Sequence, residues 1–196
     1  HGIGRPGTAT VFPQAIGMAA AFDEDMMEQV GNAVGVEARG KYNMCRAHGD
    51  RDIFKGLTVW APNINIFRDP RWGRGHETYG EDPFLTSRLG VRFVEGMQAA
   101  ACAKHFAVHS GPESDRHHFN AIVSKQDLWE TYLPAFRALV KEAGVEAVMG
   151  AYNRTNGEPC CGSKTLLKDI LRDKWHFDGH VTSDCWAIKD FHEHHM

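Results

Sequence analysis

Four short apolar segments alternate with helical segments along the chain, and this alternation limits its fold more than any other feature. The apolar segments, typical of strands, span residues 57–66, 101–108, 145–152 and 179–184. Helices are predicted between them at 82–98, 124–143 and 166–175, which is long enough for right-handed parallel crossovers. A further helix over 24–39 precedes the first strand. The pattern predicts an α/β fold with a parallel sheet.

The helix starts carry their own signals. Asp23 suits the N-cap of the first helix, and Asp82 followed by Pro83 suits the start of the second. Ser124 and Asp127 are spaced as a variant of the capping box. We interpret these residues as structural.

Two architectures fit the alternation: an open doubly wound sheet and a β/α barrel. No G-x-G-x-x-G or G-x-x-x-x-G-K-[ST] motif follows a strand, which removes the commonest reason to favour a nucleotide-binding open sheet. Polar residues instead gather at or after the ends of all four strands: Asn63, Arg68, Arg74, Lys104, His105, Tyr152, Asn153 and Asp184. Such convergence favours a (β/α)8 TIM-like barrel, which takes about 250 residues and eight strands. With about four β/α units visible, we expect an incomplete barrel.

Composition excludes several classes of partner. The 196 residues are 42% hydrophobic and 24% charged, as in globular proteins, and the net charge of -3 leaves no basic stripe for nucleic acid. No run of about 18 apolar residues predicts a membrane span. The five cysteines are odd in number and lack CxxC spacing, so neither a disulfide scaffold nor a zinc site is indicated. We expect no cofactor and no metal.

Asp184 is the first candidate for a catalytic group. The apolar run that begins at Gly179 ends abruptly in this carboxylate, at the strand end where α/β enzymes carry their chemistry. The alternative is structural, because an Asp before Trp186 could also cap a helix.

Several ordered motifs resemble glycoside hydrolase family 3 over the whole chain, from His1 to the last residues. They are Ala61-Pro62-Asn63-Ile64-Asn65-Ile66-Phe67-Arg68-Asp69-Pro70-Arg71-Trp72-Gly73-Arg74, Lys104-His105-Phe106, Glu113-Ser114-Asp115-Arg116, Tyr152-Asn153 with Asn156-Gly157, and Ser183-Asp184. The resemblance implies that residues 1–196 are part of the family's N-terminal barrel domain. It also implies that the C-terminal α/β sandwich domain lies outside this chain.

The resemblance assigns a role to six positions. Asp184 matches the catalytic nucleophile, and Tyr152 matches a tyrosine that lines the subsite near it. The residues that match those holding the sugar's hydroxyls are Arg74, Lys104, His105 and Arg116. Independently, an ionised carboxylate can capture an oxocarbenium-like centre as a covalent intermediate, and nearby cations favour the ionised form and donate to hydroxyls.

The proton donor is the missing part of this constellation. The resemblance implies a glutamate from the second domain, so we expect this chain alone to be inactive or impaired. In the β-N-acetylglucosaminidase branch a histidine from the loop after Lys-His-Phe serves instead; His109 is in place, but the Pro-Gly frame of that branch is absent. An acidic substrate-binding residue of the family is expected just before His1.

The implied function is a retaining exo-β-glycosidase that removes terminal β-linked xylose or glucose from oligosaccharides or aryl glycosides. Many β-glucosidases of the family have Trp after the nucleophile, whereas this chain has Cys185. That Cys, the His1-Gly2 opening and residues 156–161 resemble the β-xylosidase side, with α-arabinofuranosidase a further option. The alternatives are a non-catalytic sugar-binding fragment and a metal-dependent hydrolase. The chain begins at His1 without an initiator Met or a signal-peptide pattern, so we expect it to be part of a longer protein, and a periplasmic or secreted location is suspected. The sequence does not indicate the oligomeric state.

Two further groups invite a functional interpretation. The clusters at 117–118 and 192–195 contain several histidines but lack the spacing of a helical zinc pair, so a solvated loop and a fraying helix are expected. The tryptophans are interpreted as packing residues, with Trp72 in the polar loop the one to test as a sugar platform.

Overall fold

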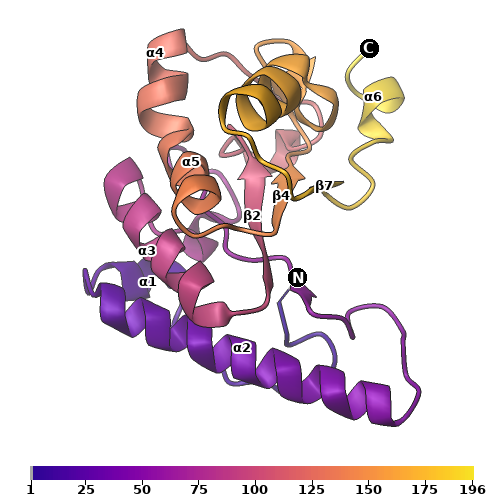
Figure 1. Cartoon of the computed structure of the whole chain (residues 1–196). Helices are drawn as coiled ribbons and strands as arrows, with labels where there is room; N and C mark the ends of the chain where they lie inside the picture. Colours follow the sequence, from indigo (N-terminus) through magenta and orange to yellow (C-terminus); the bar gives the residue numbers. More distant parts are fainter. Residues whose placement is uncertain (1) are drawn as a thin grey trace.

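The four apolar segments form one parallel sheet in the computed structural model, which describes residues 2–196 (Figure 1). The strands are β1 (Thr58–Val59), β2 (Ala100–Phe106), β4 (Ala147–Gly150) and β7 (His180–Ser183). They lie in the order β1-β2-β4-β7, and every neighbouring pair is parallel. The prediction of an α/β fold with a parallel sheet is therefore confirmed.

The first strand is much shorter than predicted. Beyond β1 the chain still runs beside β2, because the Cys102 amide donates to the Ala61 carbonyl and the Ile64 amide donates to the Lys104 carbonyl, both at 2.9 Å. Pro62 lies between these contacts and has no amide hydrogen to give to the ladder, so regular pairing is interrupted there. The segment consequently ends as a loop that carries polar side chains.

The helices begin where the caps predict. Asp23 accepts from the Met26 amide at 2.9 Å at the start of α2 (Glu24–Ala47), and Asp82 accepts from the Leu85 amide at 2.6 Å at the start of α3 (Pro83–Met97). α2 runs beyond the predicted end at residue 39, because residues 40–47 contain no proline and only one glycine.

The predicted helix over 124–143 is divided. Ser124 caps α4 (Lys125–Asp127), a π-helical turn follows at Leu128–Tyr132, and α5 covers Pro134–Lys141. Pro134 donates no hydrogen bond, so the α-helical ladder cannot run through it. The helix predicted at 166–175 is a π-type helix over Lys164–Lys174.

Short elements fill the remaining loops. They are α1 (Ala15–Ala19), α6 (Asp190–Glu193), and 3₁₀ turns at Gly75–Glu77, Glu113–Asp115 and Cys160–Gly162. A second small sheet joins β3 (Asn120–Ala121), β5 (Arg154–Thr155) and β6 (Glu158–Pro159) in segments predicted as loops. His1 lies outside the described residues.

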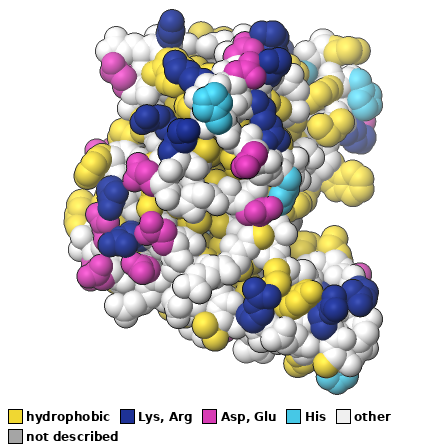
Figure 2. All heavy atoms as spheres, in the orientation of Figure 1, with side chains coloured by type: hydrophobic (Ala, Val, Ile, Leu, Met, Phe, Trp, Pro, Cys, Tyr) yellow, Lys and Arg dark blue, Asp and Glu magenta, His cyan; other side chains and the backbone are white. Residues whose placement is uncertain are grey.

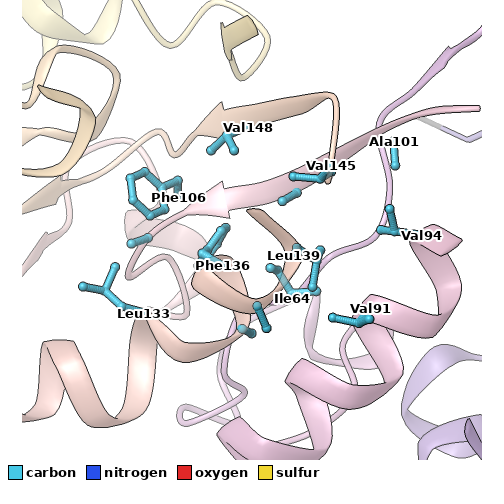
Figure 3. Packing of buried hydrophobic residues seen from close by; sticks show 14 of the residues in the cluster. Ile64, Val91, Val94, Ala101, Phe106, Leu133, Phe136, Leu139, Val145 and Val148 are labelled. Carbon is cyan, nitrogen blue, oxygen red and sulfur yellow. The ribbon is translucent and has the colours of Figure 1, made fainter. Parts of the chain in front are cut away.

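The main core lies between the sheet and helices α3 and α5. Figure 3 shows Phe136 of α5 beside Phe106 of β2, whose rings are 4.9 Å apart in a T-shaped arrangement, with Val148 of β4 nearby. Val94 of α3 packs into the same cluster. Burying these side chains on one face of the sheet leaves its carboxyl-terminal edge for polar groups.

The face of the molecule drawn in Figure 2 shows no separation of charge. Acidic and basic side chains are intermixed on the face seen in Figure 2, and Arg88 pairs with Glu24 at 2.9 Å between α3 and α2. Within residues 2–196, no helix has both the length and the apolar character needed to cross a bilayer.

Helices α2 and α3 approach closely through glycines. A Cβ atom placed on Gly35 of α2 would lie 1.9 Å from the carbonyl oxygen of Met97, and one on Gly31 would lie 2.3 Å from that of Phe93. These partners are backbone atoms, so the contact cannot relax by a side-chain rotation. The close crossing thus requires glycine at both positions.

We therefore predict that Gly35→Ala lowers the free energy of unfolding by about 2–3 kcal/mol, because the added methyl group forces the helices apart. Gly40→Ala on the same helix is the matched control. Nothing lies within 4 Å of a Cβ there, so it should stabilise by roughly 0.5–1 kcal/mol. Urea unfolding of the two variants measures both effects, and equal shifts in the same direction would contradict the packing argument.

Candidate active site

A cavity of about 500 Å³ opens at the carboxyl-terminal edge of the sheet. The structure brings all six predicted site residues into its lining: Arg74, Lys104, His105, Arg116, Tyr152 and Asp184. They come from different elements, since Lys104 and His105 end β2, Tyr152 follows β4, and Asp184 follows β7. The remaining lining residues are Gly2, Trp60, Glu77, Met149 and Cys185.

Asp184 stands directly after β7 and is 7% exposed. Its Oδ1 atom accepts from the Cys185 amide at 2.7 Å, while its buried Oδ2 atom has no hydrogen-bond partner among residues 2–196. The next helix, α6, begins only at Asp190, so Asp184 caps no helix. The interpretation of Asp184 as a helix N-cap is therefore wrong.

The ring of His105 is held in one tautomer by Asn65. The Asn65 side-chain amide donates to the carbonyls of His105 (2.8 Å) and Ala107 (3.1 Å), which fixes its orientation. Its Oδ1 atom therefore accepts, at 2.9 Å each, from the backbone amide and from Nδ1 of His105. With the proton on Nδ1, the Nε2 lone pair accepts from Arg74 Nη1 at 2.9 Å.

His105 is a neutral group in this cavity. Burial, followed by the neighbouring His109 ring and the Arg74 and Lys104 cations, holds the pKa of His105 well below its usual value. Its Nε2 atom lies 3.5 Å from Asp184 Oδ2. Because that nitrogen carries a lone pair and no proton, this approach is not an ion pair.

Arg74 is oriented by Glu77. The guanidinium donates from Nε and Nη2 to the two carboxylate oxygens of Glu77, at 2.7 Å each, in a bidentate pair. Burial alone would raise the pKa of Glu77, but the bonds and charge of Arg74, with the charge of Lys104, lower it overall. Glu77 is thus held as a carboxylate.

Lys104 contributes a second buried cation. Burial and then the charge of Arg74 lower the pKa of its ammonium group, while the carboxylates of Glu77 and Asp184 oppose that shift. The backbone of Lys104 forms an isolated parallel bridge with Asn63. The loop after β1 and the end of β2 are therefore joined at the floor of the cavity.

Arg116 and Tyr152 form one wall. The guanidinium carbon of Arg116 lies 5.2 Å from the centroid of the Tyr152 ring, in cation–π geometry, and Arg116 pairs with Glu113 at 3.0 Å. Burial, and next the charge of Asp184, raise the pKa of Tyr152, so its phenol keeps its proton.

Some polar residues at the strand ends have other partners. Arg68 donates to the Ser110 carbonyl and the Tyr132 hydroxyl, and Asn153 binds His109 Nδ1 at 3.0 Å. Neither Arg68 nor Asn153 lines the cavity. The expectation that all eight polar residues converge is therefore wrong for Arg68 and Asn153, whose side chains join loops. It is also wrong for Asn63, which does not line the cavity although its side-chain amide donates to Glu77 at 3.4 Å.

Trp60 and Trp72 have roles opposite to those predicted. Trp72 is 3% exposed and packs edge-on against His109 at 5.7 Å, so it is a packing residue and no sugar platform. Trp60, interpreted as a packing residue, lines the cavity. His109 is itself buried, lies outside the cavity lining, and its pKa is lowered by burial to about 4.

Sequence reasoning missed Glu77, Asn65 and Trp60. A signal existed for Glu77, because it lies three residues after Arg74 and that spacing places charged side chains together on a helical turn. Asn65 could not be found this way, since its partner His105 is 40 residues distant.

The histidine clusters also differ from expectation. His117 and Asp190 bond at 2.8 Å, so the C-terminal helix packs on the loop that carries Arg116 and is no fraying end. Over residues 2–196, no group of three or more His, Cys, Asp or Glu is placed to hold a metal ion, and none of the five cysteines there forms a disulfide.

The carboxyl ends of this parallel sheet surround a buried carboxylate, three basic side chains and a neutral imidazole, and this edge of the sheet is where β/α enzymes carry their active sites. Comparison with known families agrees, because the model of the glycosyl hydrolase family 3 N-terminal domain matches residues 1–196. The chain belongs to glycoside hydrolase family 3.

Relatives and solved structures place it within that family. The xylan 1,4-β-xylosidase of Xylanibacter ruminicola is 51% identical over 207 residues, covering 100% of this chain and 24% of the relative. A β-xylosidase/α-L-arabinofuranosidase of Medicago sativa is 41% identical, covering 96% and 26%.

Among solved structures, the GH3 exo-β-xylosidase XlnD in complex with a xylobiose aziridine probe matches with a TM-score of 0.82 and 35% identity, covering 93% and 24%. β-Glucosidase 3B of Thermotoga neapolitana in complex with α-D-glucose matches with a TM-score of 0.80 and 36% identity, covering 90% and 23%. The chain spans about a quarter of the length of the relatives it matches.

The buried histidines generate a prediction about acid stability. The unfolded chain binds a proton near pH 6.5 at position 109, whereas the folded chain does so only near pH 4, so stability must fall as the pH drops through this window. Between pH 7 and 5 the loss from His109 is about 2 kcal/mol.

Urea unfolding at pH 7 and 5 checks this. His109→Gln should lose about 2 kcal/mol less than the parent over that interval. His76→Gln, at an exposed position, should follow the parent. A parallel loss in the parent and in His109→Gln would show that His109 is not the responsible group.

Proposed function

We propose that this chain is the nucleophile-bearing, sugar-binding part of a retaining exo-β-glycosidase that hydrolyses terminal non-reducing β-linked sugars. The observation that carries this proposal is the Oδ2 atom of Asp184, which is buried, lacks a hydrogen-bond partner among the described residues, and faces a cavity lined by cations. A free carboxylate oxygen in such a site can attack an anomeric carbon.

The chemistry follows from the two oxygens of this carboxylate. The Cys185 amide holds Oδ1, which sets the plane of the group and leaves Oδ2 for the sugar. As the glycosidic bond breaks, Oδ2 forms a bond to the anomeric carbon, and a covalent glycosyl-aspartate results. Water then releases the sugar with its original configuration.

The remaining residues bind and orient the sugar. Arg74, Lys104 and Arg116 offer donors to hydroxyl oxygens, and Tyr152 offers a protonated phenol beside Asp184. His105 adds an acceptor at Nε2, to which Arg74 Nη1 donates at 2.9 Å and to which a sugar hydroxyl could donate in its place. We propose this set as the subsite for the terminal sugar.

Xylose is the first candidate for that sugar. The relatives named β-xylosidase support it, glucose is supported by the structures named β-glucosidase, and arabinose by the Medicago sativa proteins. Cys185, in place of the Trp found in many β-glucosidases of the family, lines the cavity beside Asp184.

We further propose that the four β/α units belong to a (β/α)8 barrel, with the general acid on a second α/β domain outside residues 1–196. The lengths of the relatives support this, because each is about four times as long as the aligned chain. The sequence that flanks this chain in its gene tests it: an open reading frame continuing into an α/β domain is expected.

One observation favours a second candidate for the chain alone, a sugar-binding fragment without catalysis. A general acid needs a carboxyl group that is protonated at working pH. Besides Asp184, the carboxyl group lining the described cavity is Glu77, and Arg74 keeps its pKa low. Glu77 therefore cannot serve as the acid.

The nucleophile can be identified directly. A 2-deoxy-2-fluoro xyloside with an activated leaving group such as dinitrophenolate, given to the full-length protein, should trap the intermediate on Asp184. The fluorine destabilises the oxocarbenium-like transition states of both steps, and the good leaving group keeps formation of the intermediate faster than its hydrolysis. Peptide mapping by mass spectrometry locates the label, and labelling of another residue contradicts the assignment.

Asp184→Asn should lower kcat by at least about a thousandfold while xylose binding survives, since the amide keeps the shape but is a poor nucleophile. Asp178→Asn, an exposed position just before β7, is the control and should keep full activity. Steady-state kinetics and calorimetric xylose titration separate the two effects.

Rates on aryl glycosides identify the sugar. We expect kcat/KM of the full-length protein to be highest on nitrophenyl β-xyloside, followed by the β-glucoside and the α-arabinofuranoside. A glucoside preference would instead place the protein on the β-glucosidase side of the family.

A further inference from the structure

The C-terminal segment 190–195 packs on the loop that carries Arg116. In Figure 1 the arrowheads of β2 and β4 point toward the side of the molecule where α6 lies, and the ion pairs place its first residue against His117. This contact joins two segments 73 residues apart in the sequence.

Asp190 is the centre of that contact. Its side chain is buried, and one oxygen accepts from Nδ1 of His117 at 2.8 Å, while the other lies 3.7 Å from Nε2 of His194. Removing His117 would leave a buried carboxylate without this bond, which is costly. The two residues are therefore mutually dependent.

His117 connects this carboxylate to the cavity. Its ring lies 4.5 Å from that of Tyr152, between centroids, and Tyr152 is the ring over which the Arg116 guanidinium stands. One short path thus runs from Asp190 through His117 to two residues that line the cavity.

The backbone of the loop is tied at the same place. Nε2 of His195 lies 2.9 Å from the carbonyl of His117, and Arg154 donates to the carbonyl of His118 at 3.3 Å. At the other end of the loop, Glu113 accepts from the Gly73 amide. The arginine consequently stands on a loop anchored on both sides.

We propose that Asp190 is a positioning residue for the sugar subsite, which acts through His117 to hold Arg116 and Tyr152 in place. The kinetic consequence rests on the proposed glycosidase function, whereas the structural consequence does not. In the proposed function Arg116 holds the sugar in the ground state and in the transition state, so its displacement should weaken both and raise KM more than it changes kcat.

Three variants of the full-length protein test this. Asp190→Leu removes the acceptor for His117 Nδ1. Because one hydrogen bond to a charged group is lost, we expect KM for nitrophenyl xyloside to rise about tenfold, while kcat stays within about threefold of the parent value. Asp190→Asn keeps an oxygen acceptor for Nδ1 and should restore KM to within about threefold of the parent. Glu193→Gln, on the same helix but paired with Lys189, should match the parent.

His117→Asn is a second variant that tests the same contact should Asp190→Leu fail to fold. Asparagine can still donate to Asp190 but has no ring to pack on Tyr152, so we expect a similar rise in KM with the segment still docked. Equal KM values for the parent, Asp190→Leu and His117→Asn overturn the proposal, as does a Glu193→Gln variant as impaired as Asp190→Leu.

A second measurement is independent of hydrolysis. In the full-length protein labelled with 13C-tyrosine, the ring signals of Tyr152 and Tyr42 are identified as those that Tyr152→Phe and Tyr42→Phe remove. Asp190→Leu should shift the Tyr152 signal and leave that of Tyr42, on α2, unchanged. An unmoved Tyr152 signal overturns the proposal that Asp190 positions the subsite. If the parent protein hydrolyses no glycoside, that result rejects only the proposed function, and the Tyr152 signal still tests the positioning role.

Discussion

The parallel ladder through β2, β4 and β7 is the constraint on which the site depends. Phe106, Gly150 and Ser183 end their strands at one level, with Phe106 paired to Gly150 and Gly150 paired to Ser183. The ladder continues one step further, since the Asp184 amide donates to the Gly150 carbonyl at 3.2 Å. Side chains next to these strand ends, such as those of His105, Tyr152 and Asp184, therefore lie together at one edge of the sheet.

Glycine at position 150 is part of that constraint. A Cβ atom there would lie 2.8 Å from the sulfur of Cys161, which in turn approaches the Ala151 carbonyl at 3.3 Å. The turn at Cys160–Gly162 thereby packs closely against the end of β4. The packing of this turn and the alignment of β4 with β7 thus depend on one backbone position.

Much of the fold was predictable because its signals are local. The caps at Asp23, Asp82 and Ser124 act within one helical turn, and the strand that ends in Asp184 is marked by neighbouring residues alone. Strand length was less predictable, because Pro62 interrupts pairing only after the ladder has begun.

The site was predictable only in part, because side-chain direction depends on distant partners. Arg68 and Arg74 follow the same strand, yet Arg68 binds Tyr132 and Arg74 binds Glu77 at the cavity. The spacing of Arg74 and Glu77, three residues apart, is a local signal for that pair, but Tyr132 lies 64 residues from Arg68 and no neighbouring residue indicates that contact. Trp60 and Trp72 differ in the same way, since only the folded chain shows which ring His109 covers.

The orientation of the Asn65 amide has a consequence for molecular selectivity. Because it leaves the one lone pair of His105 on Nε2, and Arg74 Nη1 donates to that atom at 2.9 Å, the two side chains form a single donor–acceptor pair. A hydroxyl group that enters between them would satisfy both, since it can accept from Arg74 and donate to Nε2. An ether oxygen or a fluorine can only accept and would leave Nε2 without a donor, so this corner of the cavity would favour an alcohol over its methylated or fluorinated counterpart by hydrogen-bond donation.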